Sequence, residues 1–142
     1  MVGMAILQPV VALAAWTMVM WLWMYVTRIP AMSAAKVDPD RLVLDPDASL
    51  DALLPPQVQW KAHNYNHLHE APTVFYAVAL VLAVIGAGDG LTAQIAWAYV
   101  LLRVAHSIVQ ATVNKVMVRF VLFALSSFCL VGLVLHAALA LF

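Results

Sequence analysis

The stretch Tyr99–Asn114 reads Tyr-Val-Leu-Leu-Arg-Val-Ala-His-Ser-Ile-Val-Gln-Ala-Thr-Val-Asn and sets polar side chains in an otherwise apolar part of the chain. With about 100° of rotation per residue in an α-helix, these polar residues share one face about 100° wide. They are Tyr99, Arg103, His106, Ser107, Gln110 and Asn114. An arginine at the centre of a membrane helix costs about 2.5–3.5 kcal/mol on insertion scales, so this face must contact protein or water rather than lipid. We predict that Arg103 pairs with Glu70, the only glutamate in the chain.

The composition is that of an integral membrane protein. Of the 142 residues, 65% are hydrophobic and 10% are charged, and the mean hydropathy is +0.95. Soluble domains are about 45–50% apolar and about 25% charged. The formal net charge is zero, which argues against nucleic acid as a partner. The length suits one small domain over residues 1–142, with the lipid bilayer as its environment.

Four apolar stretches predict an all-α bundle of four helices that cross the membrane alternately up and down. The expected spans cover about residues 5–27, 57–86, 92–113 and 116–141, because about 20 apolar residues cross the hydrocarbon core. In the second span Pro72 predicts a kink beside Glu70.

The connections between these spans differ in length and polarity. Residues 28–56 form the one long polar loop, in which two Asp-Pro-Asp runs predict turns and a short surface helix. The glycine-rich run at residues 86–90 predicts a tight turn. The connection at residues 114–115 is short.

The distribution of lysine and arginine predicts the orientation in the membrane. Basic residues occur in or beside the first and third connections, whereas the second connection and both termini have none. These residues are Arg28, Lys36, Arg41, Lys61, Lys115 and Arg119. Since cytoplasmic loops carry the excess of basic residues, we expect both termini on the side away from the cytoplasm.

The polar first half of the second span allows two interpretations that depend only on spacing. His63, His67 and Glu70 lie at i, i+4 and i+7, and together with His106 they form a possible zinc or iron site. A helix rich in histidine produces this spacing by chance, and we assign no residue as a metal ligand. The same residues would otherwise join neighbouring helices as a polar seam.

Two motifs carry a resemblance to a known family. Residues 70–76 read Glu-Ala-Pro-Thr-Val-Phe-Tyr, and residues 103–107 read Arg-Val-Ala-His-Ser, followed by Asn114-Lys115 and Arg119-Phe120. In this order and spacing the chain resembles the MAPEG family, the membrane proteins of eicosanoid and glutathione metabolism, and in particular its small bacterial members. The resemblance covers essentially the whole chain. It implies a four-helix protomer, a homotrimer and a location in the bacterial inner membrane.

The resemblance also implies an activity and a site. In the catalytic members, glutathione binds between protomers near the cytoplasmic side, and an arginine at the start of the fourth helix stabilises its thiolate. Arg119 matches this catalytic arginine. The implied function is that of a glutathione-dependent transferase or peroxidase acting on lipophilic electrophiles. The expected glutathione-binding positions are His63, Asn66, His67, Glu70, Arg103, His106, Gln110 and Asn114.

The chain departs from the family pattern at several of these positions. Catalytic members carry an Arg-Asn pair where this chain has Asn66 and His67, a further arginine at the position of His63, and a tyrosine at that of Gln110. Arginine binds carboxylates by paired hydrogen bonds, and glutathione has two carboxylates. The departures keep a second interpretation open, a non-catalytic membrane protein that binds lipid or serves as a scaffold.

Overall fold

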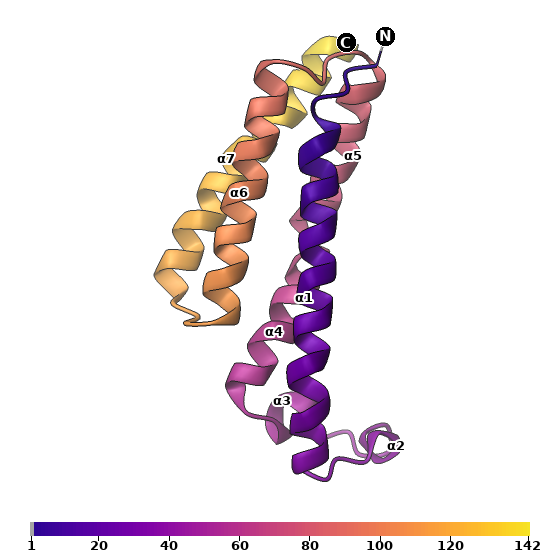
Figure 1. The fold of residues 1–142 in the computed structure, drawn as a ribbon, viewed down its shortest axis with the longest axis vertical. Helices are drawn as coiled ribbons and strands as arrows, with labels where there is room; N and C mark the ends of the chain where they lie inside the picture. Colours follow the sequence, from indigo (N-terminus) through magenta and orange to yellow (C-terminus); the bar gives the residue numbers. More distant parts are fainter. Residues whose placement is uncertain (1) are drawn as a thin grey trace.

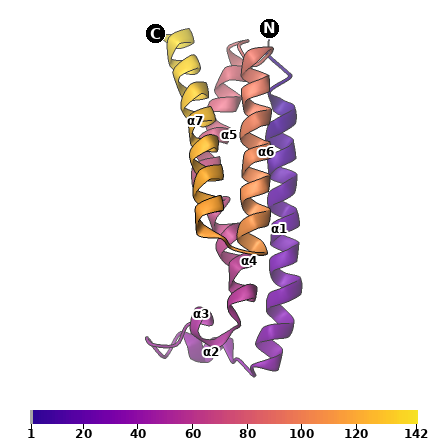
Figure 2. The same ribbon diagram turned by 90° about the vertical axis from the view of Figure 1, so that its left-hand side faces the viewer.

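Long α-helices lie side by side along one axis of the molecule (Figures 1 and 2). The structure is a computed structural model that describes residues 2–142, and these residues form α-helices and no β-strand. The predicted all-α fold is therefore confirmed. The helices are α1 (Leu7–Ala34), α2 (Pro39–Leu42), α3 (Leu50–Leu53), α4 (Pro56–His67), α5 (Ala71–Val84), α6 (Leu91–Ala111) and α7 (Val116–Leu141).

Within the described residues, three helical stretches are long and apolar enough to cross a membrane. They are Leu7–Ala34, Pro56–Val84 and Val116–Leu141. These stretches identify an integral membrane protein. Helix α6 is not among them, because Gln94, Arg103 and His106 lower its hydropathy. A fourth span at α6 stays a prediction.

The second long stretch is interrupted at the expected place. Helix α4 ends at His67, and α5 begins at Ala71 with Pro72 in its first turn. Pro72 has no N–H to donate to the Leu68 carbonyl, so the helical hydrogen bonding cannot continue through this point. Glu70 adopts non-helical dihedral angles, φ −92° and ψ −101°. The predicted kink is thus a break between two helices.

The first helix is longer than the sequence predicts, and the loop after it is more ordered. Helix α1 continues to Ala34, past the expected end at residue 27, with Pro30 inside its last turns. The loop holds two short helices rather than one. Asp38 caps α2, and Ser49 caps α3 by accepting a hydrogen bond from the backbone N–H of Ala52.

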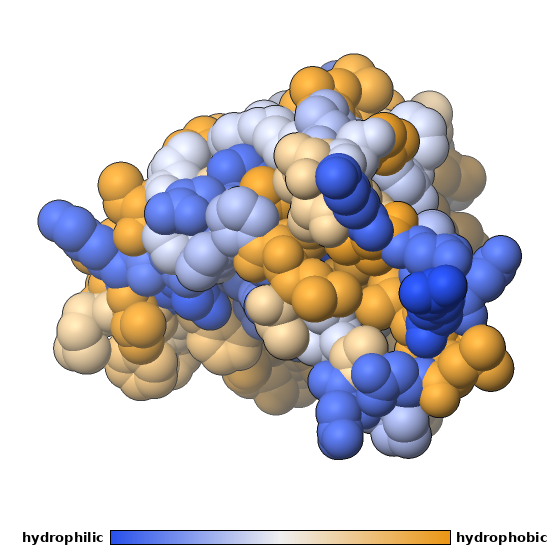
Figure 3. Space-filling view, turned by 90° about the horizontal axis from the view of Figure 1, so that it is seen from below, coloured by the Kyte–Doolittle hydropathy of each residue, from blue (hydrophilic) through white to orange (hydrophobic). Residues whose placement is uncertain are grey.

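Both termini lie at one end of the molecule, beside the turn between α5 and α6 (Figure 1). The backbone N–H of Gly3 donates to the carbonyl of Ala83 at 2.8 Å, and that of Ile6 donates to the carbonyl of Gly88 at 2.9 Å. The expected tight turn is present, with Gly86 and Gly90 at φ 77° and 65°. At the opposite end, hydrophilic residues gather around the surface formed by the loop (Figure 3).

Helix α6 lies at the centre of the packing. It packs against α1, α4 and α7, while α5 packs against α1 and α7. The buried apolar core joins these helices. Its largest fully buried members are Ile6, Leu13, Met20, Leu68, Phe75, Leu82, Tyr99 and Leu133. The polar face of α6 therefore points into protein rather than toward lipid.

Candidate functional site

The polar face of α6 is buried, as its spacing predicts. Of the residues on this face, Tyr99, Arg103 and Ser107 have no exposed surface. His106 and Gln110 are buried as well, while Asn114 follows the end of the helix. We refer to the five buried residues, Tyr99, Arg103, His106, Ser107 and Gln110, as the polar stripe of α6.

Ser107 joins three helices through this stripe. Its hydroxyl oxygen accepts hydrogen bonds from the indole N–H of Trp16 on α1, at 2.9 Å, and from the amide Nδ2 of Asn64 on α4. Asn64 has no exposed surface. Buried polar groups of this kind stabilise helix packing when they are paired, so this part of the stripe has a structural role.

Arg103 lies one helical turn before Ser107 on the same stripe. Its guanidinium group has no hydrogen-bond partner among the described residues. In the described residues, all three of its guanidinium nitrogens are buried and unpaired. Its guanidinium carbon lies 5.9 Å from the centre of the Phe123 ring on α7, a cation–π distance. The hydroxyl of Tyr99 and the Nδ1 atom of His106 are also buried and unpaired. This part of the stripe therefore lacks the partners that buried polar groups require.

The predicted pair between Glu70 and Arg103 is wrong. The carboxylate of Glu70 instead bonds to Nδ1 of His67 at 2.9 Å, and its side chain is 66% exposed. The reason is the break between α4 and α5, since the non-helical backbone at Glu70 places this side chain near the end of α4. His67 instead lies beside His106 of α6, with ring centres 5.1 Å apart.

A polar cavity of about 390 Å³ lies beside the end of α4, and we refer to it as the polar cavity. It brings together residues from α4, α6 and the start of α7. Among the candidate positions it includes all except Arg103 and His106. The lining residues are Trp60, His63, Asn66, His67, Glu70, Gln110, Asn114 and Arg119.

A second, more apolar cavity of about 250 Å³ adjoins the first, and we refer to it as the apolar cavity. The two cavities share His67 and Arg119. The other residues of the apolar cavity are His106, Val116, Phe120 and Phe123. A cationic side chain thus lies where a polar space meets an apolar one.

The connection between α6 and α7 orients Arg119. Asn114 has a positive φ of 50°, a conformation that asparagine tolerates better than most residues. The chain then enters α7 at Val116, and the Nη1 atom of Arg119 donates to the side-chain oxygen of Asn114. The Nε atom of Arg119 is buried without a partner. Asn114 thus holds one edge of the guanidinium at the lining of the polar cavity.

The metal interpretation of the second span is wrong. Across residues 2–142, no three His, Cys, Asp or Glu side chains are placed to hold a metal ion together. His63 bonds to Asp51, whereas His67 bonds to Glu70, so the two histidines face different carboxylates.

Two residues of the site were missed by sequence reasoning. Trp60 lines the polar cavity, and its spacing of three residues from His63 was a usable signal, because it extends the same helical face by one turn. Asp51 contacts His63 from the loop, and no local pattern indicates this contact.

Comparison with known protein families assigns the chain to a family. The MAPEG family model matches residues 6–139 of the 142. The chain belongs to the MAPEG family. No curated protein and no solved structure matches the chain. In this MAPEG protein the structure places Glu70 and Arg119 at one cavity.

Proposed function

We propose that this MAPEG protein is a four-helix membrane protomer, assembled as a homotrimer, that uses glutathione to conjugate or reduce lipophilic electrophiles. The observation that carries the proposal is the position of Arg119 at the junction of the polar and apolar cavities. A polar peptide thiol and an apolar electrophile could meet at this junction.

The side chains of the polar cavity suit the groups of glutathione. Glutathione has an ammonium group, two carboxylates and a thiol. The exposed carboxylate of Glu70 is suited to the ammonium group. The side-chain oxygen of Gln110 is buried without a partner and is suited to accept a peptide N–H. Arg119 supplies a cation for the thiolate.

The chemistry follows from the charge of Arg119. Glutathione, when bound, supplies a thiol whose thiolate form is the nucleophile, and a nearby cation stabilises that form. Asn114 holds one edge of the Arg119 guanidinium and so orients it. Phe120 and Phe123 form the apolar wall of the neighbouring cavity, where an electrophile entering from the lipid would lie.

The homotrimer and the orientation are part of the same proposal. The polar cavity lies on the surface of the protomer, where a neighbouring protomer would close it. The termini lie at one end, and the long loop lies at the other (Figure 2). The basic residues of the loop favour a cytoplasmic location for this end, in a bacterial inner membrane.

An assay of glutathione conjugation with purified protein tests the activity. We expect Arg119→Ala to lower the rate about 100-fold, because removing a group that stabilises developing or resident negative charge has an effect of this size. Lys115→Ala is the matched control, since Lys115 is a nearby cation that does not line the polar cavity. A rate that survives in Arg119→Ala, or wild-type protein without glutathione-dependent turnover, contradicts the proposal.

A non-catalytic lipid-binding or scaffold protein is the second candidate. One observation favours it, namely that Arg119 is the only arginine among the residues lining the polar cavity. Mass spectrometry of the purified protein would then find a bound lipid, and the conjugation assay would find no turnover.

A further inference from the structure

The polar cavity has fewer cations than glutathione requires, and this inference rests on the proposed function. Arg119 is the one arginine and Glu70 the one carboxylate that line it. If Arg119 serves the thiolate, the two carboxylates of glutathione need other partners. Two histidines, His63 and His67, line the same cavity, and His67 is already bonded to Glu70.

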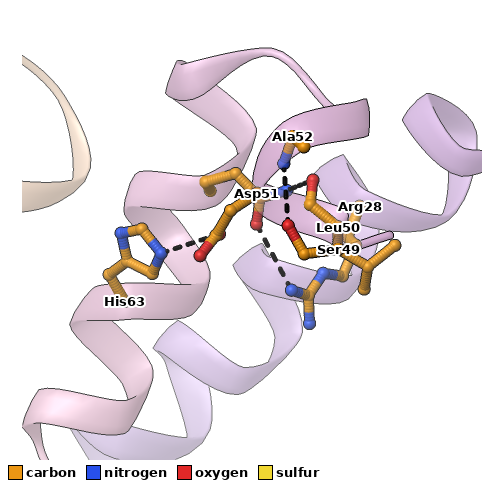
Figure 4. A network of polar contacts seen from close by, with 7 residues as sticks. Arg28, Ser49, Leu50, Asp51, Ala52 and His63 are labelled. Carbon is orange, nitrogen blue, oxygen red and sulfur yellow. Dashed lines mark hydrogen bonds and ion pairs between the residues drawn. The ribbon is translucent and has the colours of Figure 1, made fainter. Parts of the chain in front are cut away.

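We propose that Asp51, in the loop between α1 and α4, is a positioning residue that holds His63 as a carboxylate-binding group for glutathione. Figure 4 shows the two side chains pointing toward one another, His63 from α4 and Asp51 from α3. The Nε2 atom of His63 lies 2.9 Å from the Oδ1 atom of Asp51. His63 is thus held at one nitrogen by the loop while it lines the cavity.

The loop is held against α4 by contacts that do not involve Asp51. The side-chain nitrogen of Gln59 donates to the carbonyl of Leu50, and Nη2 of Arg28 donates to the side-chain oxygen of Gln59 at 3.3 Å (Figure 4). Ser49 caps α3, the short helix that contains Leu50 and Asp51. Removing the Asp51 carboxylate should therefore leave α3 in place and release only the histidine.

The pairing with Asp51 fixes which nitrogen of His63 can serve a ligand. A carboxylate accepts only, so Nε2 carries the hydrogen in both protonation states of the ring. Nδ1 is then an acceptor in the neutral ring and a donor in the charged ring. A ligand carboxylate can therefore accept a hydrogen bond at Nδ1 only from the charged ring.

The other charged groups near His63 do not pair with it. His67 and Glu70 follow it along the chain and pair with each other, and Arg119 lies across the cavity on α7. Lys61 lies over the Trp23 ring of α1, 5.4 Å from its centre. On the other elements that pack against α4, Arg28 is bonded to Gln59 and Arg103 of α6 is fully buried. Asp51 is therefore the acidic partner of His63.

Calorimetric titration of glutathione into purified protein tests the inference. We expect His63→Ala to weaken binding about tenfold, the effect of losing a hydrogen bond to a charged group. Asp51→Asn should weaken binding about three- to fivefold, in the range of an exposed pair. Because both side chains are about half exposed or more, this variant should fold with an unchanged melting temperature.

Two further variants separate the role of His63 from that of its neighbours. His63→Arg supplies a cation whose charge does not depend on Asp51, so adding Asp51→Asn to this variant should not weaken glutathione binding further. Asp47→Asn is the matched control, an aspartate of the same loop whose side chain forms no ion pair with α4. It should behave as wild type.

The outcomes distinguish this inference from the proposed function. Wild-type protein that binds no glutathione overturns both. Binding that His63→Ala or Asp51→Asn leaves unchanged, or a further loss of affinity when Asp51→Asn is added to His63→Arg, overturns only the role given to Asp51 and His63.

Discussion

At the end that carries both termini, polar groups are paired; along the polar stripe of α6, several are not. Gly3 and Ile6 bond through their backbone N–H groups to the turn between α5 and α6, and Asp89 accepts a hydrogen bond from the backbone of Ala5 at 2.9 Å. On the stripe, the nitrogens of Arg103 are buried without partners.

This difference separates a region that serves stability from one that serves binding. Unpaired buried groups destabilise a protein, and natural proteins retain them chiefly at functional sites. Ser107 shows that the stripe itself can be paired, since both of its partners come from neighbouring helices. Of the unpaired groups, Gln110 lines the polar cavity and His106 lines the apolar cavity.

The largest expected effect comes from removing the unpaired charge. Arg103→Met should stabilise the ligand-free protein by about 1–4 kcal/mol, because an apolar side chain of similar size replaces a buried group that is not compensated. Thermal unfolding in detergent measures this effect.

Arg41→Met is the control for this substitution. The Arg41 side chain is largely exposed, and its one ion pair within residues 2–142 is with Asp38. Its replacement should change stability by less than about 0.5 kcal/mol. A melting temperature that drops in Arg103→Met would mean that the guanidinium has a stabilising role, and the contrast between the two regions would be lost.

The end with the termini should be sensitive to added volume. A Cβ atom at Gly88 would lie 2.5 Å from the carbonyl oxygen of Gly3 and 2.6 Å from a methyl group of Ile6. Gly88→Ala should destabilise the protein by about 1–3 kcal/mol through this overlap. Gly132→Ala on α7 is the matched control, because nothing lies near its Cβ position. Equal melting temperatures for the two variants would show that this end is not closely packed.

The paired part of the stripe should respond to a smaller change. Ser107→Ala removes the acceptor shared by Trp16 and Asn64, and should destabilise the protein by about 1–2 kcal/mol by leaving buried donors unpaired. Ser127→Ala is the control, since the Ser127 hydroxyl donates a hydrogen bond to the carbonyl of Phe123 on its own helix. If both variants unfold at the wild-type temperature, Ser107 does not hold the helices together.

The helices and the buried face of α6 could be predicted because both follow from periodicity. Apolar runs placed the long helices, and a rotation of about 100° per residue placed Arg103, His106 and Gln110 on one face. The break before α5 was also predictable, because Pro72 lacks an N–H.

The side-chain partners could not be predicted in the same way. The Glu70–Arg103 pair assumed a helix that continues through Glu70, whereas the backbone there turns and directs the carboxylate to His67. The contact between Asp51 and His63 depends on the path of a loop of about 20 residues, which no local pattern specifies. Position along the sequence gives the face of a helix, but not what lies opposite it.

Calorimetric titration of glutathione into the purified wild-type protein is the most direct test of the central claim, which is that the polar cavity beside Arg119 binds this peptide. We predict saturable binding that Arg119→Ala weakens strongly and Lys115→Ala leaves intact. Absence of binding heat in a folded wild-type protein, or equal affinity in both variants, would contradict the claim.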